Sequence, residues 1–166
     1  MADLFCSCPD SLSMIDRILK RQLTLCQVAV ASKKRILQTV SELMRDHLPG
    51  INADEIFSQL VAREKLGSTG IGHGIAIPHC RCTGLTEAAG CLVTLRQAIE
   101  FDAMDSHPVD ILFVLLMPDN PDNNHLQTLA DLARLLDNPS LRNLLRQSRN
   151  EDDLFLTAIT GIAKAA

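Results

Sequence analysis

The 166-residue sequence lacks tryptophan and tyrosine, and aromatic residues make up only 3% of it. Apolar residues still reach 46%, so the core has to be built from leucine, isoleucine, valine and alanine side chains. The chain also lacks an excess of positive charge, because 16 basic and 20 acidic residues give a net charge of -4. Non-specific nucleic-acid binding needs a basic surface, so we expect no nucleic-acid partner.

Long hydrophobic runs and targeting signals are absent as well. The longest apolar run, Ile111–Met117, is far too short to cross a bilayer. The chain has no lysine-rich or arginine-rich tract that would bind an anionic membrane, and Met1–Cys8 has neither the positive charge nor the apolar stretch of a signal peptide. We therefore expect a cytoplasmic protein without membrane insertion.

The cysteine spacing typical of zinc sites is also missing. Among six cysteines, the close pairs are Cys6 with Cys8 and Cys80 with Cys82, each separated by one residue. Zinc ligands are commonly separated by roughly two to four residues. The chain is rich in apolar residues and shows no secretion signal, so reduced thiols are expected. The sequence predicts no metal and no cofactor.

Helical and extended patterns alternate along the chain. The predicted helices are Leu12–Lys20, one from Ser32 to about His47, one opening at Asn52 or Ala53, one capped by Asn123 or Asn124, one from Ser140, and Glu151–Ala165. The predicted strands are Leu23–Val30, Ile75–His79, Gly90–Leu95 and the central strand Asp110–Met117. Leu126, Leu129, Leu132 and Leu136 are expected to form a core stripe.

This order of elements predicts one α/β domain with a mixed β-sheet and helices on both faces. The domain is expected to span residues 13–166. The polar segment 1–12 before it is expected to be disordered.

The glycine-rich stretch from Gly67 to Gly74 is the most unusual part of the chain. It has four glycines in eight residues, which lets the backbone approach a ligand closely. A Walker loop would end in Gly-Lys-Ser/Thr, and a dinucleotide fingerprint would lead into a helix, so neither motif fits. Ser68 and Thr69 are equally well interpreted as phosphate donors or as turn-forming residues. The candidate loop residues are Gly67, Ser68, Thr69, Gly70, Gly72 and Gly74.

His79 follows Pro78 directly after this stretch, and we assign the chemistry to it. A neutral imidazole nitrogen is a nucleophile toward phosphorus near neutral pH. Arg63 offers a guanidinium whose geometry matches phosphate. His125 lies in the first turn of a predicted helix, where the helix dipole favours an anion. We predict that His79 accepts a phosphoryl group, with Arg63 and His125 stabilising its charge.

The run Gly67-Ser-Thr-Gly-Ile-Gly-His-Gly-Ile-Ala-Ile-Pro-His79 closely resembles the active-site motif of fructose/mannitol-type IIA proteins of the bacterial phosphotransferase system. The resemblance covers most of the chain, from Ser32-Lys33-Lys34 to His125-Leu126, and looks closest to the nitrogen-regulatory branch. The family fold, a mixed sheet with helices on both sides, agrees with the fold expected from the patterns.

The resemblance implies a role for each candidate residue. In that family the histidine of the Ile-Pro-His motif accepts phosphate from an HPr-like phosphocarrier, a role that transfers to His79. The supporting arginine and second histidine of the family match Arg63 and His125. The implied function is that of a phosphotransferase component and phosphorylation-dependent regulator, with potassium-transport regulators among possible targets. The IIA component of a fructose/mannitol-type sugar transporter remains an alternative.

Two positions depart from the family pattern: His73 stands where asparagine is common, and Cys80 where glycine is common. A metal or thiol sensor that uses His73, His79, Cys80 and Cys82 is therefore a minor alternative. Strand alternation opposes it, because on a continuous strand the two histidines would face one side and the two cysteines the other.

Overall fold

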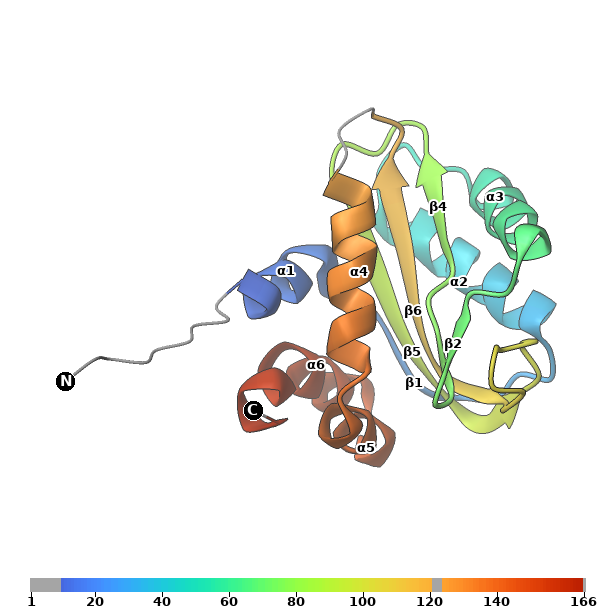
Figure 1. Cartoon of the computed structure of the whole chain (residues 1–166). Coiled ribbons are helices and arrows are strands. Elements are labelled where there is room, and N and C mark those ends of the chain that lie inside the picture. The colour runs from blue at the N-terminus through green and yellow to red at the C-terminus, as the bar shows by residue number, and fades with distance from the viewer. Residues whose placement is uncertain (1–9, 121–123, 166) are drawn as a thin grey trace.

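The computed structural model describes residues 10–120 and 124–165, in which helices flank one sheet (Figure 1). The elements in chain order are α1 (Asp10–Ile18), β1 (Leu19–Val28), α2 (Lys33–His47), α3 (Ala53–Leu66), β2 (Gly70–Gly72), β3 (Ile75–Ala76), β4 (His79–Cys82), β5 (Ala89–Ile99), β6 (Val109–Pro118), α4 (Asn124–Leu136), α5 (Pro139–Gln147) and α6 (Glu151–Ala165).

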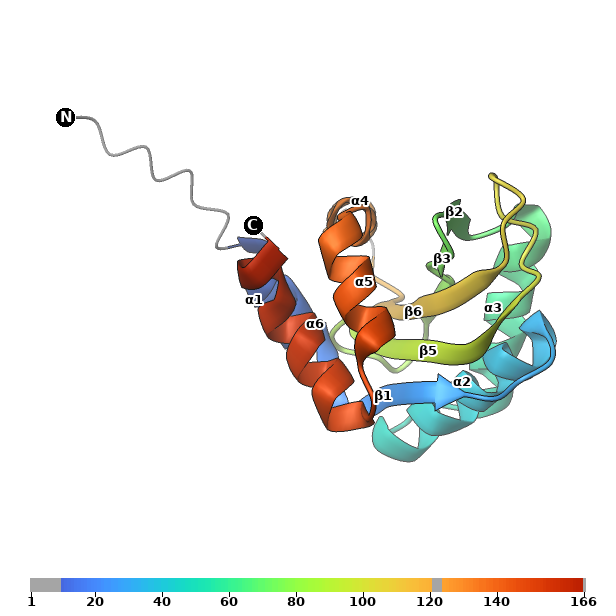
Figure 2. The same cartoon turned by 90° about the horizontal axis from the view of Figure 1, so that it is seen from below.

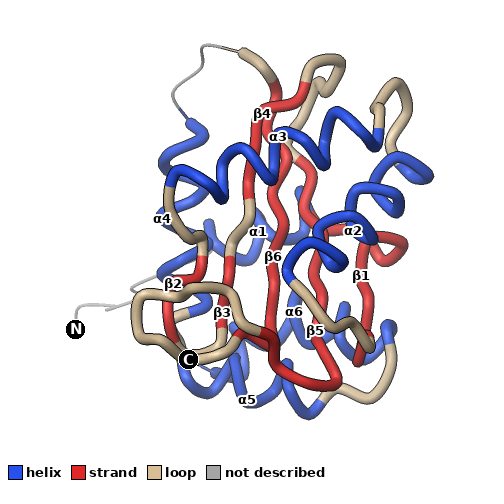
Figure 3. Tube along the Cα trace, turned by 90° about the vertical axis from the view of Figure 1, so that its right-hand side faces the viewer, coloured by secondary structure: helices blue, strands red, loops and turns tan. Residues whose placement is uncertain are grey.

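The described strands form one six-stranded mixed sheet in the order β1-β5-β6-β3-β2, with β4 also paired to β6. β5 runs antiparallel to β6, whereas β3 and β4 run parallel to it and β1 runs parallel to β5. β6 is therefore the central strand, as its apolar run predicts. Figure 3 looks onto the sheet from the side of α2 and α3, with β1 at one edge and β2 and β4 at the other.

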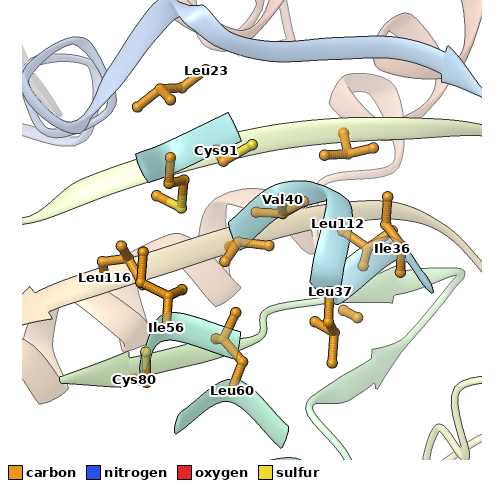
Figure 4. Close-up of a cluster of buried hydrophobic side chains, with 14 of the residues drawn as sticks. Leu23, Ile36, Leu37, Val40, Ile56, Leu60, Cys80, Cys91, Leu112 and Leu116 are labelled. Carbon is orange, nitrogen blue, oxygen red and sulfur yellow. The ribbon is translucent and has the colours of Figure 1, made fainter. Parts of the chain in front are cut away.

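The two faces of the sheet carry separate hydrophobic clusters. Helices α2 and α3 pack on one face, and α1, α4, α5 and α6 pack on the other (Figure 2). Figure 4 shows part of the α2/α3 cluster, in which Val40 of α2 and Leu60 of α3 lie over Leu112 of β6 and Cys80 of β4. The predicted single α/β domain with helices on both faces is confirmed.

Local capping sets the starts of α2 and α3. The Ser32 hydroxyl accepts a hydrogen bond from the Arg35 N–H at 3.2 Å. The Asn52 side chain accepts one from the Asp54 N–H at 2.8 Å. Both caps satisfy first-turn N–H groups that have no partner within the helix. The predicted helix starts at Ser32 and Asn52 are confirmed.

The predicted strand Ile75–His79 is wrong in one respect, because it is two short strands. β3 pairs Ile75 with Ile111 and β4 pairs His79 with Leu115, in the same register on β6. Pro78 lies between them and has no N–H to donate, although its carbonyl accepts from the Leu115 N–H at 2.9 Å. The missing donor interrupts the edge just before His79.

The leucine stripe of α4 also needs a correction at its start. Leu132 and Leu136 are buried and Leu129 packs against them, but Leu126 is 79% exposed. Counting back one full turn from Leu129 reaches His125 rather than Leu126. The inward-facing position in the first turn of α4 therefore belongs to His125.

Two other predictions concern residues that lie wholly or partly outside the described chain. Residues 1–9 of the segment expected to be disordered, and the alternative cap Asn123, lie outside the described residues. Residues 10–12 belong to α1. None of the described helices has the length and apolar content to span a membrane.

Candidate functional site

His79 opens β4 at the edge of the sheet, where α3 lies on one side and α4 on the other (Figure 1). Side chains alternate along this strand. Cys80 and Cys82 are buried in the α2/α3 cluster, so His79 points to the opposite face and remains half-buried. An edge position leaves the imidazole within reach of residues from beyond the sheet.

Both ring nitrogens of His79 have defined neighbours. Nδ1 lies 2.8 Å from the carbonyl oxygen of Ile77. Nε2 lies 3.3 Å from Nε of Arg63, which donates to it. A carbonyl only accepts and a guanidinium only donates, which assigns the proton to Nδ1 and the lone pair to Nε2. The nitrogen that faces Arg63 is thus the nucleophilic one.

The surroundings favour the neutral form of this imidazole. Burial lowers the pKa of His79 below the ordinary value of 6.5, and the positive charge of Arg63 lowers it further. The hydrogen bond to the Ile77 carbonyl and the carboxylate of Glu64 act in the opposite direction and raise the pKa. Since the lowering effect wins, Nε2 keeps its lone pair at neutral pH.

Arg63 reaches the site from the last turn of α3. Its Nη1 donates to the carbonyl oxygen of Gly67 at 2.9 Å, while Nε faces His79. This anchor holds the guanidinium beside Nε2, where a phosphoryl group on that nitrogen would carry its negative charge. The structure therefore brings the predicted arginine and the predicted acceptor together.

His125 lies in the first turn of α4. Its Nδ1 atom is buried and has no hydrogen-bond partner within the described part of the chain. Between described residues, no hydrogen bond or ion pair joins His125 to His79 or Arg63. His125 is one turn before Leu129, which lines a hollow together with His79. Among the described residues, the second histidine thus lies on the same face of α4 as Leu129 but makes no hydrogen bond with His79.

Two hollows flank His79. One, of about 300 Å³, lies between the glycine-rich loop and α4, and its walls include Thr69, Ile71 and Leu129. The other, of about 430 Å³, lies along α3 and is lined by Leu66 and Arg81. The imidazole is accessible from both sides of Arg63.

The hydroxyl groups of Ser68 and Thr69 donate hydrogen bonds to other residues of the protein. Ser68 donates its proton to the Phe101 carbonyl at 2.6 Å, and Thr69 donates to Glu64 at 2.6 Å. A hydroxyl carries one proton, so neither proton is left for an anion in this arrangement. Both residues stabilise the loop.

The glycines make room for the protein's own side chains. A Cβ on Gly70 would lie 2.7 Å from the Cβ of Ala103, and a Cβ on Gly74 would lie 2.5 Å from Nη2 of Arg146. Gly74 also has a φ of 78°, in the region that favours glycine. The hollow between the loop and α4 is lined by Ser68, Thr69 and Ile71, whereas Gly70 and Gly74 pack against Ala103 and Arg146.

The arrangement gives no support to the metal or thiol sensor. His73 lies in the turn between β2 and β3, not on a continuous strand, and its ring is exposed. Burial raises the pKa of the Cys80 thiol to about 12 and also raises the pKa of the Cys82 thiol, which disfavours the thiolate form that a metal ligand needs. Within the described residues no group of three or more histidine, cysteine or acidic side chains is placed to hold a metal ion.

Sequence reasoning missed Glu64, which accepts hydrogen bonds from the N–H and the hydroxyl of Thr69. On α3 alone it looks like a solvated charge beside Arg63. The contact forms because α3 ends at Gly67 and the residues just beyond it place Thr69 against Glu64. No periodic pattern continues past the end of the helix, so only the structure reveals the pair.

Comparisons with known proteins identify the family of the chain. The family model "Phosphoenolpyruvate-dependent sugar phosphotransferase system, EIIA 2" matches residues 17–158. The nitrogen regulatory protein of Pseudomonas aeruginosa is 43% identical over 141 residues, which is 85% of this chain and 92% of that protein.

Solved structures agree as well. The crystal structure of nitrogen regulatory protein IIA-Ntr from Neisseria meningitidis has a TM-score of 0.80 at 36% identity, over 88% of this chain and 98% of that one. The mannitol IIA structure from Escherichia coli shares the fold, with a TM-score of 0.68 at 16% identity over 83% and 96% of the two chains. The resemblance read from the glycine-rich motif is confirmed, and the chain belongs to the EIIA 2 family of the phosphoenolpyruvate-dependent sugar phosphotransferase system.

Proposed function

We propose that this phosphotransferase-system protein accepts a phosphoryl group on Nε2 of His79 from an HPr-like phosphocarrier in the cytoplasm. The observation that carries the proposal is that the two ring nitrogens of His79 have different hydrogen-bond partners. Nδ1 is held by the Ile77 carbonyl at 2.8 Å, and Nε2 presents its lone pair beside a guanidinium at 3.3 Å. This arrangement suits a phosphoryl acceptor, because Nε2 carries the lone pair and the guanidinium that donates to it can shift to the phosphoryl oxygens when phosphorus takes its place.

The transfer needs little covalent machinery. A bond forms between Nε2 and phosphorus while the phosphorus–nitrogen bond of the carrier breaks, and the electron pair of that bond returns to the carrier imidazole. The Nδ1 proton stays on His79, where the Ile77 carbonyl stabilises the positive charge that develops on the ring. Arg63 offsets the negative charge of the phosphoryl oxygens.

A protein donor fits the surroundings of His79 better than a free metabolite does. Leu66 is 85% exposed and Ile71 is 39% exposed, and each lines one of the two hollows beside the histidine. Exposed apolar side chains around a reactive group are typical of a surface that another protein covers. His125 supplies a second imidazole at the near end of α4.

The regulatory half of the proposal follows from charge. A phosphoryl group adds about -1.5 to -2 charges at neutral pH to the surface that includes Leu66 and Ile71. A partner protein that binds this surface when it is uncharged is then repelled by the phosphorylated form, and a partner that needs the added charge binds only the phosphorylated form. We therefore propose that phosphorylation of His79 selects among protein targets, in the manner that the nitrogen-regulatory relatives suggest by name. Regulators of potassium transport are one class to test.

Incubation with enzyme I, an HPr-like carrier and labelled phosphoenolpyruvate tests the transfer. We expect one acid-labile label per chain, located in the peptide that contains His79. An unlabelled protein, or label that resists acid, would refute the proposed acceptor.

Affinity capture from a lysate tests the regulatory role. The bait is compared in three forms: unmodified, phosphorylated, and the His79→Ala variant. We expect the phosphorylated form to lose or gain partners relative to the other two. Identical partners in all three forms would remove the switch, and transfer of the label onward to a IIB protein would favour the sugar-transport alternative.

A further inference from the structure

Three sets of hydrogen bonds, joined through the backbone of Thr69 and of Ile77, link the carboxylate of Glu64 to the imidazole of His79. The Glu64 oxygens accept from the N–H of Thr69 at 3.1 and 3.2 Å and from its hydroxyl at 2.6 Å. The Thr69 carbonyl accepts from the N–H of Ile77 at 3.0 Å. The Ile77 carbonyl then lies 2.8 Å from Nδ1 of His79.

The carboxylate at the start of this chain is buried and held in place. Only 6% of the Glu64 side chain is exposed, and Nζ of Lys33 lies 3.0 Å from Oε1. Lys33 also lies over the Phe101 ring at 4.6 Å, whereas its pair with Asp102 at 3.1 Å is solvent-screened because the Asp102 side chain is 79% exposed. Because a buried carboxylate needs donors, this complete set of partners keeps Glu64 in one position.

Neighbouring residues of α3 therefore act on the two ring nitrogens of His79. Arg63 faces Nε2 directly, and Glu64 acts on Nδ1 through the backbone of Thr69 and of Ile77. The hydrogen bond made by one ring nitrogen determines which tautomer a histidine adopts. If the Ile77 carbonyl moved away, the proton would be free to occupy Nε2, and the nucleophilic lone pair would be lost.

We propose that Glu64 is a positioning residue for phosphoryl acceptance. It holds the Thr69 carbonyl and the Ile77 peptide so that His79 keeps its proton on Nδ1 and its lone pair on Nε2. This inference rests on the proposed function of His79, but its first readout is a property of the unphosphorylated protein.

Nitrogen NMR of the histidine side chains gives that readout, at a pH where His79 is neutral. We expect wild-type His79 to be in the Nδ1–H form. Glu64→Gln keeps the shape of the side chain but replaces one acceptor oxygen by a donor, so the Nε2–H form becomes detectable. Asp102→Asn is the matched control, because it removes the other carboxylate on Lys33 and leaves the Glu64–Thr69 contact intact. The control keeps the wild-type tautomer.

Phosphorylation rates at a fixed carrier concentration give the second readout. We expect the Glu64→Gln rate to fall about tenfold, as for loss of one charge-assisted hydrogen bond, and the Asp102→Asn rate to stay at the wild-type value. Thr69→Val removes only the hydroxyl contact and gives a smaller fall, and Thr69→Ser restores the rate. This rescue separates positioning from general loosening of the fold, which thermal unfolding monitors in parallel.

The outcomes separate the positioning role of Glu64 from the proposed function of His79. A folded Glu64→Gln protein with the wild-type tautomer and the wild-type rate would overturn the positioning role. If Glu64→Gln does not fold, the Thr69→Val and Thr69→Ser pair carries the test, and equal tautomers and rates in that pair overturn the role. A wild-type protein that accepts no phosphate would instead refute the proposed function, whatever its tautomer.

Discussion

His73 and His79 belong to the same glycine-rich segment, yet the protein uses different parts of them. At His79 the ring matters, since Nδ1 and Nε2 lie 2.8 and 3.3 Å from Ile77 and Arg63. At His73 the backbone matters: its φ is 56°, its N–H donates to Asp105 at 2.9 Å, and its carbonyl accepts from Arg146 at 2.6 Å.

The comparison explains a departure from the family pattern. A positive φ is tolerated best by glycine, and among other residues asparagine and histidine are enriched there. A histidine in place of the usual asparagine at residue 73 therefore preserves the turn between β2 and β3. The difference teaches that a residue's contacts, more than its type, decide whether it belongs to the site.

Substitutions of His79 and of His73 should give the largest difference in phosphoryl labelling. His79→Gln removes the nucleophile and should abolish the acid-labile label. His73→Asn keeps the turn and should be labelled at the wild-type rate. Quantitative labelling of both variants checks this, and a loss of label in His73→Asn would mean that the exposed ring takes part in transfer.

Replacing Arg63 should have the next largest effect on phosphorylation, because Arg63 contacts the ring of His79 and not that of His73. Arg63→Met should slow phosphorylation about a hundredfold, the usual cost of removing one donor that stabilises developing charge. Arg134→Met is the matched control, since Arg134 pairs with Asp131 on the exposed side of α4. Single-turnover rates measure both, and an Arg63→Met rate close to that of the control would remove Arg63 from the mechanism.

The backbone role of His73 predicts an effect on stability. His73→Val places a β-branched side chain at a φ of 56° and should lower the free energy of unfolding by about 1–3 kcal/mol. His73→Asn should leave it near the wild-type value. Urea unfolding of the two variants measures the difference. Equal stabilities would show that the turn tolerates any residue at this position.

The smallest expected effect is on proton binding. Because burial lowers the pKa of His79, half-protonation should occur below pH 6.5 in an NMR titration. The folded state then binds fewer protons than the unfolded state in this range. The stability contributed by neutral His79 is complete above pH 6.5 and is lost as the pH falls toward the folded-state pKa. A midpoint above pH 6.5 would contradict the assigned environment.

The sequence predicted the parts of the fold that local chemistry controls. Ser32 and Asn52 cap helices with their own side chains, and the apolar run of β6 needs no partner to be recognised. His79 and Arg63 were singled out by their chemistry and then by the resemblance to a known family. Glu64 was missed, because its contact with Thr69 forms only beyond the end of α3 at Gly67.

Two other features were ambiguous for a related reason. In the first turn of α4, a spacing of three residues back from Leu129 suggests Leu126, and a spacing of four suggests His125. Both are allowed helical spacings, so only packing against the sheet decides between them. The interruption at Pro78 was also hidden, since the pairing of His79 with Leu115 continues the register of β3.

The position of the phosphoryl group on the imidazole tests the central claim most directly. Phosphorus and nitrogen NMR of the phosphorylated protein, with labelled histidine, identifies the nitrogen bonded to phosphorus. The hydrogen bond from Nδ1 to Ile77 and the lone pair beside Arg63 predict one phosphoryl group, on Nε2 of His79. Phosphate on Nδ1, or on another residue, would contradict the account.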